Sequence, residues 1–201
     1  YRDYLEDNEK ALADYNKGIE VDPEAASLYY EIGSTYYNTN QYDLALANLL
    51  KVVDLEPNYV NANNYIGIIY KNYIKDYHKA IEYYTKEIEL TPDADHTYRN
   101  IGNIYTYNLV DYDKALENYT KAIEVGPENP TNYEARGDFY RNNLEDDEKA
   151  LADYNKGLEI DPEDASLYYE IGKTYYNTKK HDLALTNFLK VVELDPTYEN
   201  A

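Results

Sequence analysis

The sequence predicts an all-α fold in which short antiparallel helix pairs stack one after another. Glycines recur every 34 or 35 residues, at Gly33, Gly67, Gly102, Gly137 and Gly172. Prolines recur at a matching interval, at Pro57, Pro92, Pro127, Pro162 and Pro196. A repeat of this length is typical of solenoid proteins, in which one helix pair cannot bury its apolar face alone and must pack against its neighbours.

Each unit begins with a helix, here called helix A, that carries the glycine. The local frame in the first full unit is Tyr29-x-x-Ile32-Gly33-x-x-Tyr36, and Gly102 lies in the same frame. Spacings of three and four residues place these side chains on one face of a helix. The glycine allows a second helix to approach that face closely.

The second helix of each unit, helix B, combines a small residue with a large one four positions later. The small residues are Ala45, Ala80, Ala115, Ala150 and Ala184. The large residues are Leu49, Tyr84, Tyr119, Tyr154 and Phe188. We expect the alanine to meet the glycine of helix A. The proline ends helix B because it lacks a backbone N–H and cannot continue the helix.

These signals predict a single solenoid over residues 1–201. Residues 1–25 hold only the C-terminal half of a unit, marked by Ala11, Tyr15 and Pro23. Five full units follow, and residues 199–201 match the start of another one, so we expect a segment of a longer array. The full units span residues 26–59, 60–94, 95–129, 130–164 and 165–198.

Some units depart from the pattern. Asn63 stands where the first large residue of helix A belongs, and Arg136 stands where leucine or isoleucine belongs. Gly18, Glu87 and Gly157 replace a second small residue, normally alanine, in helix B. Four units also have one extra residue between the last tyrosine of helix A and the alanine of helix B, for which we expect a slightly longer turn. These stretches run from Tyr1 to Ala11, Tyr70 to Ala80, Tyr105 to Ala115 and Tyr140 to Ala150.

The order of these residues resembles the tetratricopeptide repeat over essentially the whole chain. The resemblance implies a right-handed superhelical α-solenoid and a non-catalytic scaffold that binds a protein or peptide in a concave groove lined by helix A. It also implies which positions face that groove. They carry Tyr30, Ser34, Tyr37, Asn38, Asn64, Tyr65, Ile68, Lys71, Asn72, Arg99, Asn100, Asn103, Tyr107, Arg141 and Asn142.

The whole groove face has four basic and four acidic residues, so the surplus acid is expected elsewhere. Lys71 and Arg99 lie in a stretch of this face without acidic residues, which favours a seat for a carboxylate or an extended backbone. Two familiar groove specificities do not transfer. The carboxylate clamp fails at Ala135, and the asparagine ladder fails at Glu31 and Tyr65, where asparagine is required.

Composition excludes several other functions. The formal net charge is -20, from 39 acidic and 19 basic residues, which disfavours nucleic acid and anionic membranes as partners. No apolar run is long enough for a membrane span, and no secretion signal is visible. The cytoplasm and the extracellular space both remain open. Cysteine is absent.

Few residues could carry chemistry. The three histidines, His78, His96 and His181, fall at unrelated places in the repeat frame. The acidic run from Glu145 to Glu148 lacks the ligand spacing of a calcium loop and is typical of a helix start. We therefore expect no catalytic residue, no metal and no cofactor.

An alternative to peptide binding is end-to-end stacking into oligomers or filaments. Residues 1–59 align with residues 140–198, and 44 of the 59 pairs are identical. This offset equals four units, and neither end shows the polar capping helix that solenoids need. Head-to-tail contacts that do not close produce filaments. A third alternative is a non-catalytic domain of a larger enzyme or secretion machine.

Overall fold

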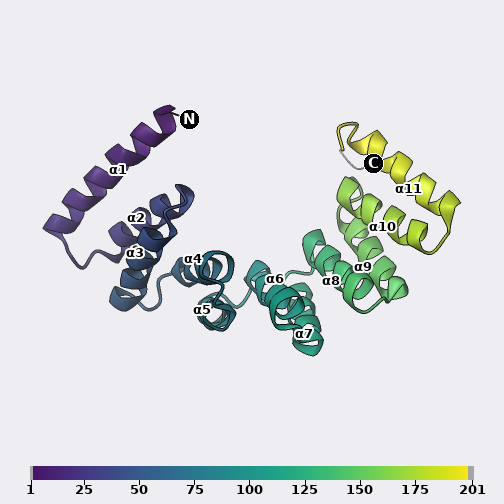
Figure 1. Ribbon diagram of the computed structural model, residues 1–201, viewed down its shortest axis with the longest axis horizontal. Coiled ribbons are helices and arrows are strands. Elements are labelled where there is room, and N and C mark those ends of the chain that lie inside the picture. The colour runs from purple at the N-terminus through teal and green to yellow at the C-terminus, as the bar shows by residue number, and fades with distance from the viewer. Residues whose placement is uncertain (1, 199–201) are drawn as a thin grey trace. The chain divides into compact units, whose positions relative to one another are not determined.

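The computed structural model describes the backbone of residues 2–198 and the side chains of residues 7–198. Over these residues the chain forms eleven α-helices and two π-helical turns, and no strand (Figure 1). The prediction of an all-α fold is confirmed. The expected start of a further unit at residues 199–201 lies outside the described residues. The chain divides into two compact units, Tyr1–Pro92 and Asp93–Ala201.

The first unit contains five α-helices and one π-helical turn. Helices α2 and α3 form one pair, and α4 and α5 form the next, while α1 packs on α2 and α3 packs on α4. The elements are α1 (Arg2–Val21), α2 (Ala26–Asn38), α3 (Tyr42–Leu55), α4 (Ala62–Ile69), η1 (Tyr70–Ile74) and α5 (Tyr77–Leu90).

The second unit has the same organisation, with pairs α6–α7, α8–α9 and α10–α11. Here α7 packs on α8, and α9 packs on α10. Its elements are α6 (Asp95–Ile104), η2 (Tyr105–Leu109), α7 (Tyr112–Val125), α8 (Pro130–Asn143), α9 (Asp147–Ile160), α10 (Ala165–Asn177) and α11 (His181–Leu194). Every helix B ends two residues before its proline, in agreement with the sequence signal.

In each pair the glycine of helix A lies against the large residue of helix B, and not mainly against the alanine that the sequence suggested. A Cβ atom on Gly102 would lie 2.8 Å from Cε1 of Tyr119, and one on Gly137 would lie 2.6 Å from Cε1 of Tyr154. Ala115 beside this contact is fully buried. The helix axes are therefore closer than any side chain on the glycine would allow.

The extra residue of the longer units is not placed in a longer turn, as the sequence suggested, but in the last turn of helix A. In the shorter unit the N–H of Gln41 donates to the carbonyl of Tyr36, five residues earlier (2.8 Å). In a longer unit the N–H of Asp76 donates to Tyr70, six residues earlier (3.0 Å). The Asp76 carboxylate also caps α5 by accepting from the N–H of Lys79 (3.1 Å). In this unit and in the unit of η2 the insertion widens the end of helix A into a π turn. In the unit of α8, where Asp146 forms the same bond and the same cap, helix A is one residue longer than α2 and has no π turn.

The half unit at the N-terminus differs from its expected form. A turn was predicted between Tyr1 and Ala11, but α1 is continuous from Arg2 to Val21. Tyr1 itself lies outside the described residues. The equivalent stretch from Tyr140 to Ala150 does contain a turn. There the N–H of Asp146 donates to the carbonyl of Tyr140 (2.9 Å), and α8 packs on α9. Among the described helices α1 packs mainly on α2, and no packing of the kind that α8 makes with α9 divides it.

The departures from the repeat pattern are compensated by their neighbours. Arg136 forms a two-pronged ion pair with Asp153 on α9, with both N–O distances at 2.8 Å. Asp153 is 7% exposed, so the pair is largely buried. Gly157 provides room for Leu167 of the next helix, whose Cδ1 would lie 2.7 Å from a Cβ atom on the glycine.

We expect Arg136→Ala to lower the free energy of unfolding by about 3–5 kcal/mol, because Asp153 would remain buried without its cation. The double variant Arg136→Leu with Asp153→Asn should recover most of this loss, since it removes both charges. Denaturant unfolding monitored by circular dichroism measures both effects. Equal losses in the single and double variants would contradict the role assigned to the pair.

Candidate functional site

The predicted groove residues are divided between the two units. Nine lie on α2, α4 and η1 of the first unit, from Tyr30 to Asn72. Six lie on α6, η2 and α8 of the second, from Arg99 to Asn142.

In the first unit the predicted tyrosines form a connected aromatic surface. The ring of Tyr65 packs edge-on against Tyr37 (centroids 5.0 Å apart) and Tyr30 (6.0 Å). Burial, together with the nearby Tyr65 and Tyr59 hydroxyls, raises the pKa of Tyr30 to about 12. Burial also raises the pKa of Tyr37. The phenols of Tyr30 and Tyr37 therefore stay protonated at neutral pH and can both donate and accept hydrogen bonds.

A small hollow of about 100 Å³ adjoins this aromatic surface. Its lining includes three residues of the predicted groove, Tyr37, Ile68 and Asn72. The other predicted groove residues of this unit contribute polar groups along the same helices. They are Ser34, Asn38, Asn64 and Lys71, of which only Asn38 is classed as exposed. Burial lowers the pKa of Lys71, with the neighbouring Lys75 adding to the effect.

The second unit does not present Arg99 as a free cation. Its guanidinium lies 3.3 Å from the Asp95 carboxylate, and it donates to the side-chain oxygen of Asn132. Asn132 is fully buried and ties the network to α7 by donating to the carbonyl of Ala122 (3.0 Å). Arg99 thus joins α6 to α8. The sequence suggested that it binds a ligand carboxylate, but its charge is already neutralised by Asp95.

Arg141 has a similar structural role between α8 and α10. It is 9% exposed, pairs with Asp138 (3.1 Å) and with the Glu170 carboxylate, and donates to the backbone carbonyl of Glu170 (3.2 Å). Arg99 and Arg141, two of the predicted groove cations, are therefore paired in contacts between adjacent repeats.

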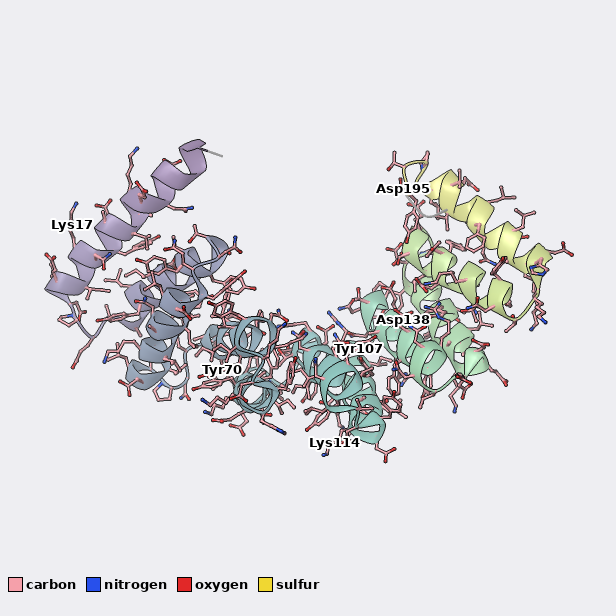
Figure 2. All side chains as sticks on the ribbon, in the orientation of Figure 1. Lys17, Tyr70, Tyr107, Lys114, Asp138 and Asp195 are labelled. Atoms are coloured by element: carbon pink, nitrogen blue, oxygen red, sulfur yellow. The ribbon has the colours of Figure 1, made fainter. Side chains whose placement is uncertain are left out.

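A hollow of about 280 Å³ opens on the helix A face of the second unit. Tyr107 and Asp138, labelled in Figure 2, lie on its lining, and Tyr107 is 62% exposed. The hydroxyl of Tyr119 donates to the side-chain oxygen of Asn103 (2.7 Å) at the same place. The lining residues are Asn103, Tyr107, Tyr119, Thr131, Glu134, Ala135 and Asp138.

The hollow is acidic, which the predicted site residues did not anticipate. Burial raises the pKa of Glu134, and the charges of Asp138, Asp164 and Glu170 add to the effect, while a hydrogen bond from Ser166 (2.6 Å) opposes it. The repeat frame already placed Glu134 and Asp138 on the groove face. What the sequence did not show is that Arg99 pairs with Asp95 outside the hollow and that Arg141 is shared between Asp138 and Glu170. Glu134 is then the acid of the lining that has no ion pair among the described residues.

The pKa of Asp138 is also raised, first by burial and then by the charge of Glu170. The hydroxyl of Tyr154, which donates to its carboxylate (2.7 Å), opposes this shift, as do Arg141 and Lys173. A second negative charge in the same hollow is thus costly in the free protein. An incoming cation would relieve that cost, whereas a carboxylate would increase it.

Across the described residues, no three His, Cys, Asp or Glu side chains are grouped so that they could hold a metal ion. None of the described helices is long and apolar enough to cross a bilayer.

Stability should depend on pH through Glu134. In the folded state the pKa of Glu134 is raised above its ordinary value of 4.5. Above pH 4.5 the folded state therefore binds a larger fraction of a proton at Glu134 than the unfolded state does. The free energy of unfolding consequently falls as the pH rises. We expect Glu134→Gln to raise the melting temperature at pH 7 and to have little effect at pH 4. The exposed Glu117→Gln serves as control. A melting temperature for Glu134→Gln at or below the wild type at pH 7 would contradict this assignment.

Comparison with known proteins identifies the repeat. A family model described as the tetratricopeptide repeat matches residues 26–59, 96–129 and 165–198. A second, described as a TPR repeat, matches residues 4–40 and 142–179. No curated protein sequence matches the chain.

Several solved structures are similar over most of their length. A crystal structure of MamA protein is 25% identical, with a TM-score of 0.70, and the match covers 89% of this chain and 98% of that one. A MamA fragment from Desulfovibrio magneticus RS-1 is 24% identical, with a TM-score of 0.71 and coverage of 87% and 97%. YrrB, described as a TPR protein with an unusual peptide-binding site, is 22% identical, with a TM-score of 0.66 and coverage of 92% and 93%. With the family matches, these likenesses lead to one conclusion: the chain belongs to the tetratricopeptide repeat family.

Proposed function

We propose that this chain is a non-catalytic scaffold that binds an extended segment of a partner protein along its helix A face. Proteins of this family are typically scaffolds, and the similar structure of YrrB is described as peptide-binding. The observation that carries the proposal is the acidic, tyrosine-lined hollow of the second unit. It provides an opening, the exposed ring of Tyr107 and the carboxylate of Glu134, which has no ion pair among the described residues. The second carboxylate, that of Asp138, already pairs with Arg141.

The preferred segment carries a lysine or arginine side chain. Glu134 and Asp138 attract it, and the exposed ring of Tyr107 offers a cation–π contact. Arg99 does not offset this preference, because Asp95 and Asn132 already engage it. In the first unit, the packed rings of Tyr30, Tyr37 and Tyr65 offer rigid contact area for apolar side chains of a segment.

We expect a library of tagged octapeptides to show selection for lysine or arginine on the wild-type chain. Glu134→Gln should abolish that selection, and Tyr107→Ala should weaken the selected peptides by about tenfold or more, as for aromatic anchors in other interfaces. Fluorescence anisotropy measures both. Glu117→Gln, which removes the same charge from the exposed face of α7, should leave binding unchanged.

Arg99→Glu is a poor probe of this groove, since it would break the network that joins α6 to α8. The proposal is wrong if no library peptide binds, or if Tyr107→Ala and Glu134→Gln bind every selected peptide as tightly as the wild type.

A second candidate is end-to-end self-assembly, which the surface of α11 favours. Leu185, Leu189 and Val192 are 58%, 60% and 46% exposed on one face of this helix. Their counterparts in α3 include Leu50 and Val53, which are only partly exposed because α4 packs on α3. The face of α11 has the same apolar character without a described helix to cover it.

If this second candidate is right, the mass measured by light scattering should rise with concentration, and Leu189→Glu should hold the chain at monomer mass. Glu193→Gln on the same helix is the control, since it removes a charge without affecting the apolar face. A constant monomer mass in the wild type at high concentration would exclude self-assembly.

A further inference from the structure

One helix A lacks the aromatic residue that its counterparts share. Asn63 on α4 occupies the position held by tyrosine in the other four full units. Those tyrosines are Tyr29, Tyr98, Tyr133 and Tyr168. The ring of Tyr29 reaches the proline that ends the preceding helix B, where its hydroxyl donates to the carbonyl of Pro23 (3.3 Å). The proline equivalent to Pro23 in the unit of Asn63 is Pro57.

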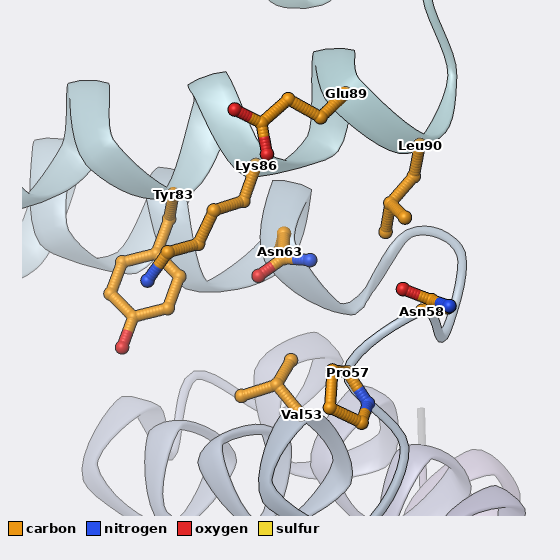
Figure 3. A pocket seen from close by; sticks show the side chains of 8 residues that line it. All are labelled: Val53, Pro57, Asn58, Asn63, Tyr83, Lys86, Glu89 and Leu90. Carbon is orange, nitrogen blue, oxygen red and sulfur yellow. The ribbon is translucent and has the colours of Figure 1, made fainter.

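The missing ring leaves a hollow of about 310 Å³ in the first unit. Figure 3 shows the Asn63 side chain in the middle of it, with Val53 and Pro57 on one side and Tyr83 and Lys86 on the other. Asn58, Glu89 and Leu90 complete the lining. The walls come from α3, the turn after it, α4 and α5, so the place of an inserted ring is fixed by four segments of one compact unit. This hollow is separate from the groove on the helix A face.

The Asn63 amide borders this hollow. Asn63 is only 2% exposed, and its side chain forms no hydrogen bond with another of the described residues. Its amide is not among the fully buried polar groups without a partner, so it faces the open space of the hollow. A ligand group that fills the hollow can therefore bond to this amide in place of water.

The rim offers aromatic and apolar contact. The ammonium of Lys86 lies over the Tyr83 ring, 4.4 Å from its centroid, and bonds to Glu82 (2.6 Å). Val53, Pro57 and Leu90 supply apolar surface beside it. A flat ring suits such a slot better than a branched aliphatic chain, because the other four full units carry a tyrosine ring at this position of the repeat.

We propose that this hollow is a docking site for a tyrosine side chain supplied by a partner protein. The ring takes the place that the repeat's own tyrosine occupies in the other units, and its hydroxyl exchanges a hydrogen bond with the Asn63 amide. A phenylalanine would fill the slot but leave the amide unpaired.

The test is a titration of the full chain with N-acetyl-tyrosine amide, followed by the NMR shifts of backbone amides. We expect saturable one-to-one binding, with the affected amides confined to residues 53–63 and 83–90. N-acetyl-phenylalanine amide should bind roughly three- to tenfold more weakly, the value of one lost hydrogen bond.

Asn63→Tyr should fill the hollow from within, abolish binding and raise the melting temperature. Asn155→Tyr makes the same substitution on the exposed side of α9 and should leave binding intact. Asn63→Leu should remove the preference for tyrosine over phenylalanine. The proposal is overturned if the shifts do not saturate, if Asn63→Tyr binds as well as the wild type, or if both probes bind the wild type equally.

Discussion

The close contact between helix A and helix B is the constraint on which each repeat depends. At Gly33 the partner is Leu49, and at Gly67, Gly102, Gly137 and Gly172 it is an aromatic ring of helix B. A Cβ atom at any of these five positions would lie 2.6–2.8 Å from the partner. No side chain fits at that separation without moving one helix, so the glycine sets how near the helices lie. The alanine of helix B, such as Ala115, is also fully buried beside this contact.

Because this contact is kept in every full unit, other positions can change as long as a neighbour compensates. Arg136 replaces an apolar residue and is matched by Asp153, and Gly157 makes room for Leu167. Glu87 replaces a small residue and accepts a hydrogen bond from the N–H of Asn61 at the start of α4 (3.1 Å). Asn63 is the departure without such a match, and the hollow beside it is the consequence.

Whether a charged residue of the predicted groove is available to a ligand depends on the residues that it already pairs with. The sequence places equal numbers of acids and bases on the helix A face. In the second unit Arg99 and Arg141 are engaged in contacts between adjacent repeats, and Asp138 is one of the partners of Arg141. Glu134 borders an open hollow and has no ion pair among the described residues, so a face that is neutral by count still offers a negative charge to a ligand. Neutral tyrosine hydroxyls, such as that of Tyr30, complete the surface with hydrogen-bonding groups.

The sequence by itself determined the all-α class and the pairing of helices, because these follow from spacings along a single helix. Through the repeat frame it also predicted which positions face a groove, and this stays a prediction. The tertiary structure decided that each glycine meets the large residue of helix B, and that π turns follow Ile69 and Ile104 while α8 has none. It also decided the pairing of Arg141 with Glu170 and the hollow at Asn63, because each depends on which side chains from different helices meet, and distances between helices are not encoded in spacing along one of them.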